Sequence, residues 1–300
     1  MVDGGRPSWS VEGVDWPNRQ HSAFVKAGGL SWHKQRLGEG PQLLLLHGTG
    51  ASTHSFRDLA PLLAADFDVL APDLPGHGFT DMPQRAGLSL PGMARLVGAL
   101  LTQADFSPDI AVGHSAGAAI LIEMTLAGLI RPRVIVSLNG ALVPIRGASL
   151  FSPLAKLLFL NPLVPRLFAW RALSHDATRR VLEGTGSTID SRGVELYQRL
   201  FRSPGHVSGT LGMMANWDLH ALQRRVQRLD VPLVLISASN DRTIPPGDAS
   251  IIARMTRSAR VVPLATGGHL LHEEQPDAVA ALIAEAARDD GVLPVKNEGL

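Results

Sequence analysis

Short apolar runs alternate with helical patterns over most of the chain. Six runs rich in Val, Leu and Ile end at turn residues, and they lie at 42–47, 68–72, 110–113, 134–138, 233–238 and 260–264. Continuous apolar runs of this length are typical of strands that are covered on both faces. Helical patterns lie at 55–65, 90–103, 115–129, 246–255 and 276–288. Strand alternating with helix predicts an α/β fold with a mostly parallel sheet.

Two segments depart from this alternation. Residues 22–36 predict a short antiparallel pair that turns at Gly28 and Gly29. Residues 141–230 are helical and loop-like, with prolines as breakers, before a strand returns near 231. We interpret this insertion as a helical cap. The predicted organisation is therefore a core of residues 1–140 and 231–300 with a cap at 141–230.

The composition of the predicted cap bears on its ligand. Residues 150–170 are strongly apolar, and residues 145–230 hold 12 basic against six acidic residues. An apolar, cationic cap favours an amphiphilic substrate that carries carboxylates, or contact with an anionic membrane surface. The alternative, in which the apolar positions only pack and the arginines face solvent, stays open.

Composition excludes several classes of protein. The 300 residues are 45% hydrophobic, carry a formal net charge of +1 and include no cysteine. Disorder and a globally basic nucleic-acid binder are not indicated, and disulfides, thiol nucleophiles and Cys-ligated metals are excluded. The beginning of the chain lacks a signal-peptide pattern, which makes the cytoplasm the default location. The nearly uncharged run 111–130 holds His114, Ser115 and Glu123, and this favours a buried strand and helix over a membrane span.

One serine lies where a nucleophile is expected. Residues 113–117 read Gly-His-Ser-Ala-Gly, and they follow a predicted strand and precede an Ala-rich helix. That context is the one a nucleophile elbow requires, with Ser115 exposed on a sharp turn beside a helix N-terminus. A serine in an ordinary tight turn is the alternative interpretation.

A serine hydroxyl needs a base, and the base needs a carboxylate that orients it. His269 follows the last predicted strand in the sequence Thr-Gly-Gly-His, and His272 is its competitor. Asp241 directly follows the strand at 233–238, whereas Asp248 is better placed as a helix N-terminal residue. The order Ser115, Asp241, His269 is the nucleophile–acid–base order of this architecture.

An oxyanion hole would complete this site. The loop His47-Gly48-Thr49-Gly50 ends the first strong strand, and its glycines allow close backbone approach. We assign the backbone N–H groups of Thr49 and Ala116 as donors to the developing negative charge. The same loop lacks the phosphate-loop signature, and the histidine pair 269/272 lacks the spacing of a zinc-protease helix. The sequence indicates no metal or organic cofactor.

Together these motifs resemble the α/β-hydrolase superfamily. The matching pieces, in order, are His47-Gly48, the run 73–78 (Asp-Leu-Pro-Gly-His-Gly), the run 113–117, Asn240-Asp241 and Gly268-His269. The resemblance covers about residues 22–287. It implies an eight-stranded, mostly parallel sheet with helices on both faces, a helical cap between strands six and seven, and triad positions for Ser115, Asp241 and His269.

A narrower resemblance links the chain to the magnesium-chelatase accessory proteins of bacteriochlorophyll biosynthesis. It rests on residues 15–19, 22–25, 28–33, 44–56 and 213–219. It implies a role near magnesium insertion into protoporphyrin and a contact with magnesium chelatase. An apolar cap with arginines is compatible with a flat tetrapyrrole that carries propionates.

Two functions follow from the sequence. The first is a serine hydrolase that cleaves an ester or another acyl bond of an apolar or amphiphilic substrate. The second is a porphyrin-binding accessory protein that uses the fold without turnover, because fold does not imply function. A dehalogenase is disfavoured because it would carry Asp in place of Ser115.

Overall fold

A single sheet of eight strands organises the protein. The structure is a computed structural model that describes residues 5–144, 161, 163–172 and 174–294. The strand order is β1-β2-β4-β3-β5-β6-β7-β8. The strands are β1 (Ser22–Ala27), β2 (Leu30–Leu37), β3 (Gln42–Leu46), β4 (Asp68–Pro72), β5 (Ile110–His114), β6 (Val134–Leu138), β7 (Leu233–Ala238) and β8 (Ala259–Leu264).

Most strand pairs run parallel, as the sequence predicts. The pairs from β4 through β8 are parallel, whereas β2 is antiparallel to both β1 and β4. The antiparallel pair at 22–36 is confirmed, and it turns at Gly28 and Gly29, both of which have a positive φ. The predicted α/β fold with an eight-stranded sheet is confirmed.

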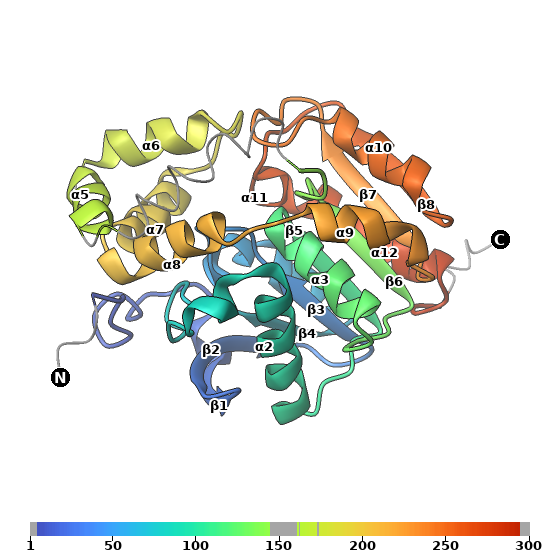
Figure 1. The fold of residues 1–300 in the computed structure, drawn as a ribbon, viewed down its shortest axis with the longest axis horizontal. Coiled ribbons are helices and arrows are strands. Elements are labelled where there is room, and N and C mark those ends of the chain that lie inside the picture. The colour runs from blue at the N-terminus through green and yellow to red at the C-terminus, as the bar shows by residue number, and fades with distance from the viewer. Residues whose placement is uncertain (1–4, 145–160, 162, 173, 295–300) are drawn as a thin grey trace.

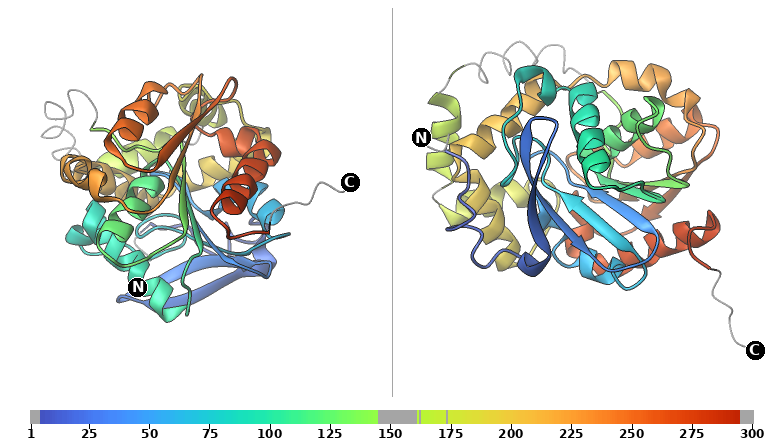
Figure 2. Two further views of the ribbon diagram at one scale, coloured as in Figure 1. Left: turned by 90° about the vertical axis from the view of Figure 1, so that its right-hand side faces the viewer. Right: turned by 90° about the horizontal axis from the view of Figure 1, so that it is seen from below.

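Helices cover both faces of the sheet (Figures 1 and 2). The helices α2 (Leu90–Gln103), α3 (Ala116–Leu126) and α10 (Gly247–Met255) pack on one face, and α1 (Leu59–Leu63) and α12 (Pro276–Asp289) on the other. Side chains of β3 alternate between the two cores: Leu44 and Leu46 face the first, Leu43 and Leu45 the second. Leucine at every position of that run therefore reflects burial on both faces.

The predicted helix at 55–65 is wrong in its bounds. The structure divides this segment into a short 3-10 turn, η2 (Thr53–Phe56), and α1. The turn closes by a hydrogen bond from the Arg57 N–H to the His54 carbonyl, and the side chains of Ser55 and Arg57 are held by Glu273. Long-range bonds thus replace the helical periodicity that the sequence suggests.

Between β6 and β7, the described residues form five helices, in the place where the resemblance implies a helical cap. They are α5 (Leu163–Arg171), α6 (His175–Glu183), α7 (Ser191–Phe201), α8 (Pro204–Ala215) and α9 (His220–Arg225). In Figure 1, α5 to α8 form one end of the molecule. Part of the apolar stretch at 150–170, namely 150–160 and 162, lies outside the described residues. The division of the chain into a core and a cap domain stays a prediction.

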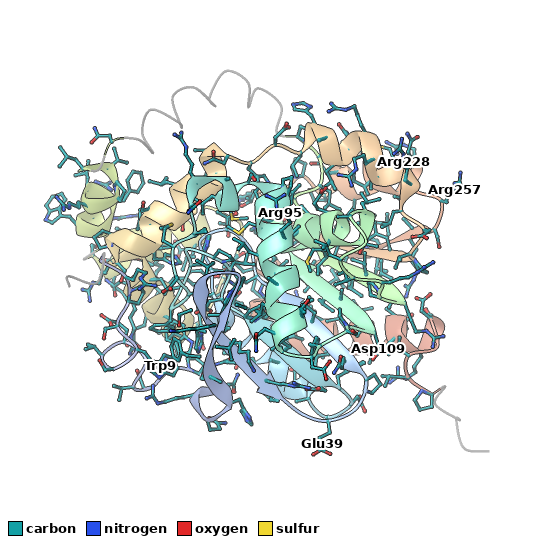
Figure 3. All side chains as sticks on the ribbon, turned by 60° about the horizontal axis from the view of Figure 1, so that its bottom comes forward. Trp9, Glu39, Arg95, Asp109, Arg228 and Arg257 are labelled. Atoms are coloured by element: carbon teal, nitrogen blue, oxygen red, sulfur yellow. The ribbon has the colours of Figure 1, made fainter. Side chains whose placement is uncertain are left out.

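The remaining short elements are η1 (Arg19–His21), η3 (Arg85–Leu88), η4 (Val226–Arg228) and α11 (Leu271–Glu274). Figure 3 labels Glu39 and Asp109, which precede β3 and β5 and mark the amino-terminal ends of the parallel strands. Of the helices between β6 and β7, α8 contacts the loops that follow β3 and β4, whereas α9 packs against α3. None of the helices in the described part of the chain is long and apolar enough to cross a membrane.

Candidate active site

Ser115 stands on a strained turn between β5 and α3. Its φ of 51° and ψ of −116° lie outside the regions that side chains ordinarily adopt. The flanking glycines make this turn possible. A Cβ on Gly113 would lie 2.5 Å from the Ala118 nitrogen, and one on Gly117 would lie 2.2 Å from the Leu46 carbonyl oxygen. The Gly-x-Ser-x-Gly pattern is therefore a steric requirement of the turn, as a nucleophile elbow demands.

The structure brings Ser115, His269 and Asp241 together. The His269 Nε2 lies 3.1 Å from the Ser115 Oγ, and its Nδ1 lies 2.8 Å from the Asp241 Oδ2. Both distances are hydrogen-bond lengths. The three residues come from the turn after β5 and the loops after β7 and β8. All three are buried, and Ser115 retains 8% exposure.

The carboxylate of Asp241 is itself held in place. Its Oδ1 accepts backbone N–H bonds from Thr243 at 2.7 Å and Ile244 at 2.8 Å. This leaves Oδ2 for the His269 ring, whose Nδ1–H donates to it. The Nε2 is then the acceptor that faces the Ser115 hydroxyl, which is the tautomer that a general base needs.

The two competing residues lie elsewhere. The Nε2 of His272 bonds to the Ser55 Oγ at 2.7 Å and not to Ser115. Asp248 lies in the first turn of α10. His269 and Asp241, and neither His272 nor Asp248, therefore form the series of hydrogen bonds with Ser115.

Two side chains that sequence reasoning missed fix the backbone of His269. The Asn139 Nδ2 donates to the carbonyls of Gly268 and His269, and its Oδ1 accepts from the Ala238 N–H. The His114 Nε2 also donates to the His269 carbonyl, at 2.9 Å. Asn139 lies at the end of β6 with a positive φ of 44°, and a polar residue at the carboxyl end of a strand was the available signal.

Two further buried histidines, His114 and His272, lie near Ser115 and His269 in the sequence and pack against each other. The rings of His114 and His272 are 4.4 Å apart. Burial, followed by the neighbouring histidines, lowers the pKa of His114 well below its usual range. Burial likewise lowers the pKa of His272 to about 3. Both rings are therefore uncharged at neutral pH, so they add no positive charge beside the imidazole that would take up the serine proton.

The predicted oxyanion loop passes directly over the serine turn. A Cβ on Gly48 would lie 3.0 Å from the Ser115 Cβ, so only glycine permits this approach. The Ser115 N–H is already used, because it donates to the Leu138 carbonyl. This leaves the next N–H, that of Ala116, as the expected donor from the turn. Thr49 follows Gly48 in the same loop, and its N–H as the second donor stays a prediction.

The loop around His77 is structural. Asp73 is fully buried and accepts backbone N–H bonds from Thr53 and Phe79 and a bond from the His33 ring. Burial alone would raise its pKa, but His33 and these donors hold the pKa well below its usual range. Within the described residues, no group of three His, Asp or Glu side chains is arranged to hold a metal ion.

The cap covers the oxyanion loop. The Thr49 hydroxyl donates to the Met213 sulfur at 3.5 Å, and Gly50 lies beside Thr210. Both partners belong to α8. The loop that passes over the serine turn is thus in contact with a helix of the predicted cap.

Comparison with known proteins agrees with this arrangement. The profile described as "Alpha/beta hydrolase family" matches residues 43–282. The chain is 38% identical, over 91% of its length and 96% of the relative's, to the "Magnesium-chelatase 30 kDa subunit" of Rhodobacter capsulatus. It is 26% identical to the "Pyrrolizixenacetamide deacetylase" of Xenorhabdus hominickii, over 82% of this chain and 90% of that protein.

Solved structures share the fold. The epoxide hydrolase CorEH superimposes with a TM-score of 0.76 at 19% identity, over 89% of this chain and 98% of that one. At such identity the likeness shows the fold alone. The family profile and the similarity to the chelatase subunit extend over most of the sequence, and we conclude that the chain belongs to the alpha/beta hydrolase family, together with the magnesium-chelatase 30 kDa subunit.

Proposed function

We propose that the protein is a serine hydrolase that cleaves an ester or another acyl bond of an apolar or amphiphilic substrate. The observation that carries the proposal is the hydrogen-bonded series Ser115 Oγ, His269 Nε2, His269 Nδ1 and Asp241 Oδ2, with separations of 3.1 Å and 2.8 Å at its two links. A serine on a strained, solvent-restricted turn with an oriented base is the arrangement that nucleophilic catalysis requires.

The reaction would proceed in two halves. The Ser115 oxygen attacks the acyl carbon while its proton passes to the His269 Nε2, and the N–H groups of Thr49 and Ala116 hold the negative oxygen. The leaving group takes that proton as its bond to the acyl carbon breaks, and an ester to Ser115 remains. Water then attacks this ester, gives one proton to His269 and releases the acid as Ser115 regains its hydrogen. Asp241 stabilises the imidazolium in both halves.

A role in magnesium-porphyrin and bacteriochlorophyll biosynthesis is the second part of the proposal. Its support is the similarity to the magnesium-chelatase 30 kDa subunit over nearly the whole of both chains. The exposed arginines of the cap, such as Arg166 and Arg180, are suited to pairing with substrate carboxylates. The partners that we propose are thus a porphyrin-like substrate and magnesium chelatase.

Labelling with a fluorophosphonate probe tests the catalytic part. We expect stoichiometric labelling of the folded protein, with the adduct on the peptide that contains Ser115. Ser115→Ala should abolish it. Ser137→Ala, which alters a buried serine on the adjacent strand β6, should not. A folded wild-type protein that resists the probe would contradict the proposal.

A binding function without turnover is the second candidate. One observation favours it: the relative with 38% identity is named as a chelatase subunit and not as a hydrolase. The two candidates differ in what Ser115→Ala does. If the variant binds protoporphyrin as the wild type does and restores pigment synthesis in a deletion strain, catalysis is dispensable. If pigment synthesis fails and an acylated or esterified tetrapyrrole accumulates, the hydrolase is supported.

A further inference from the structure

A buried histidine of the cap joins two loops of the core. His206 lies in α8 and is 1% exposed. Its Nδ1 lies 3.0 Å from the backbone nitrogen of Gly78, and its Nε2 lies 3.1 Å from the carbonyl oxygen of Gly50. A backbone N–H can only donate and a carbonyl can only accept. His206 must therefore be neutral, with its hydrogen on Nε2.

The two partners of His206, Gly50 and Gly78, lie in the loops that follow β3 and β4. Gly50 ends the loop His47-Gly48-Thr49-Gly50, one residue after the Thr49 N–H that we assign to the oxyanion hole. Gly50 has a φ of 81° and Gly78 a φ of 49°, so neither backbone conformation suits an ordinary side chain. Glycine adopts such conformations without strain, so external contacts decide how the peptide groups at these two positions are directed.

The helix that carries His206, α8, packs closely against the core. A Cβ on Gly209 would lie only 1.9 Å from the Gly76 carbonyl oxygen, so α8 contacts the loop after β4 backbone to backbone. Burial is the main reason why the pKa of His206 falls to about 4. The ring also packs edge-on against His77, at 5.4 Å between centroids. The backbone contact of α8 and the His77 ring thus restrict the movement of the His206 ring, which donates to the Gly50 carbonyl.

We infer that His206 is a positioning residue that sets the oxyanion loop from the cap, so that α8 is a working part of the oxyanion hole as well as a cover. With the Gly50 carbonyl held toward α8, the preceding backbone turns the Thr49 N–H toward Ser115. We call the two hydrogen bonds of His206, to the Gly50 carbonyl and from the Gly78 N–H, the clamp. The inference about the oxyanion hole rests on the proposed hydrolase function, but the clamp itself can be tested without turnover.

Two near-isosteric variants separate the two bonds. In His206→Gln, the side-chain amide reaches the place of Nε2 and can still donate to the Gly50 carbonyl. In His206→Asn, the amide oxygen reaches only the place of Nδ1, keeps the Gly78 bond and loses the bond to Gly50. A histidine that merely fills space would also be affected more by asparagine, because asparagine is the smaller residue and leaves a cavity. His206→Met is therefore the third variant, since methionine keeps about the volume of the ring but can donate to neither loop. A space-filling role predicts that methionine is tolerated, whereas the positioning role predicts that it fails as asparagine does. The positioning role predicts loss with asparagine and rescue with glutamine.

The first readout is amide hydrogen exchange over residues 47–51. We expect exchange to rise about tenfold or more in His206→Asn and to stay within about threefold of wild type in His206→Gln. Asn216→Ala is the matched control, because the Asn216 side chain bonds only within α8, to the Gly212 carbonyl. Equal protection in His206→Asn and His206→Gln, a rise in the glutamine variant alone, or wild-type protection in His206→Met would overturn the inference.

The second readout is steady-state hydrolysis of a p-nitrophenyl ester. His206→Asn should lower kcat about tenfold or more with little change in KM, because the oxyanion hole acts on the transition state. A wild-type protein with the expected exchange pattern but no reaction with ester or probe would count against the proposed function and not against the clamp. An active His206→Asn with an unprotected loop would count against the clamp's role.

A measurement on the wild type covers the case in which a variant does not fold. A nitrogen NMR spectrum that correlates the ring nitrogens and carbons of His206 reports which nitrogen carries the hydrogen. The clamp requires the Nε2–H form at pH 7. An Nδ1–H form or an imidazolium would overturn it.

Discussion

At the residue scale, the site depends on places where backbone approaches backbone. Gly117 is one such case, because a Cβ at this position in α3 would lie 2.2 Å from the carbonyl oxygen of Leu46 at the end of β3. Any side chain there must displace the Leu46 carbonyl or move α3. Either movement would alter the turn that presents the serine.

Gly117→Ala and Gly247→Ala form a matched pair. A Cβ on Gly117 would lie 2.2 Å from the Leu46 oxygen, whereas one on Gly247 meets nothing within 4 Å. We expect Gly117→Ala to lower the free energy of unfolding by about 1–3 kcal/mol or more through overpacking. It should also abolish probe labelling. Gly247→Ala, at the start of α10, should leave stability unchanged or raise it by up to about 1 kcal/mol. Urea unfolding measures both, and equal midpoints would contradict the expectation.

Asn139 is the second residue-scale test. Asn139→Ala leaves the Ala238 N–H and the Gly268 carbonyl without their side-chain partner in a buried place, at about 1–3 kcal/mol for each unsatisfied group. The His269 carbonyl keeps its bond from His114. We therefore expect lower stability and slower labelling of Ser115, measured by urea unfolding and probe kinetics.

The control for this change is Asn240→Ala. Asn240 is exposed, and its amide makes a single bond, to the Gly186 carbonyl. Removing an exposed partner should change the free energy of unfolding by less than about 1 kcal/mol. If the two alanine variants unfold alike, the bonds of Asn139 do not hold the His269 loop.

At the element scale, the N-terminal segment ties the cap to the core. The carboxylate of Asp15 accepts hydrogen bonds from Arg192 and Arg199, both on α7. Trp16 packs with Leu196 and Leu200 of the same helix, and its ring N–H donates to Thr53 of the core. Residues 15 and 16 thus contact α7 and η2 at once.

Trp16→Ala and Trp170→Ala compare the same change in two places. Trp16 is 2% exposed and Trp170 on α5 is 66% exposed. Trp16→Ala should lower the free energy of unfolding by about 3–5 kcal/mol. Trp170→Ala should stay within about 0.5 kcal/mol of wild type. Hydrogen exchange should also rise over α7 in the first variant only, and unchanged protection of α7 would show that the segment does not anchor the cap.

The exposed apolar face of α5 allows a test of the expected membrane contact. Leu163, Leu167, Phe168 and Trp170 are each more than half exposed, and Arg166 and Arg171 lie on the same helix. Apolar side chains flanked by arginines suit the surface of an anionic bilayer. We expect the protein to sediment with vesicles of phosphatidylcholine and phosphatidylglycerol, and less with phosphatidylcholine alone.

The double variant Phe168→Glu/Trp170→Glu should weaken this binding at least tenfold. Val11→Glu/Val14→Glu is its control, because Val11 and Val14 are comparably exposed at 68% and 62% in the N-terminal segment. Equal sedimentation of the two double variants would show that the apolar face of α5 does not bind the bilayer. Dimerisation on size-exclusion chromatography that the α5 variant abolishes would assign the face to a second copy instead.

The elements also show how far the sequence could predict the structure. Strands such as β5 and β7 are continuous apolar runs, and their ends place Ser115 and Asp241 because carboxyl ends of parallel strands share one edge. The partners of Asn139 and His206 could not be predicted in this way. Gly268 is 129 residues from Asn139, and Gly50 is 156 residues from His206, and no local pattern encodes such contacts. The wrong bounds of the helix predicted at 55–65 have the same cause, since Glu273 holds Ser55 and Arg57 at the start of that segment.

At the scale of the whole molecule, the fold encloses many neutral histidines. Burial lowers the pKa of six of them: His47, His54, His77, His114, His206 and His272. In the unfolded chain each would titrate near its ordinary value of about 6.5. Below pH 6.5 the unfolded chain therefore binds protons at these histidines that the folded protein does not bind. This difference makes the free energy of unfolding depend on pH.

The sign of this coupling sets the last prediction. Between pH 6.5 and about 4 the unfolded state binds a proton at His206 and the folded state does not, so the free energy of unfolding falls as the pH falls. The window for His272 extends to about pH 3. Each site contributes a slope of about 1.4 kcal/mol per pH unit within its window. His272→Gln should remove about one such slope. Urea unfolding from pH 7 to pH 4 measures the slopes, and a wild-type protein equally stable at both ends would show that these rings are not held neutral.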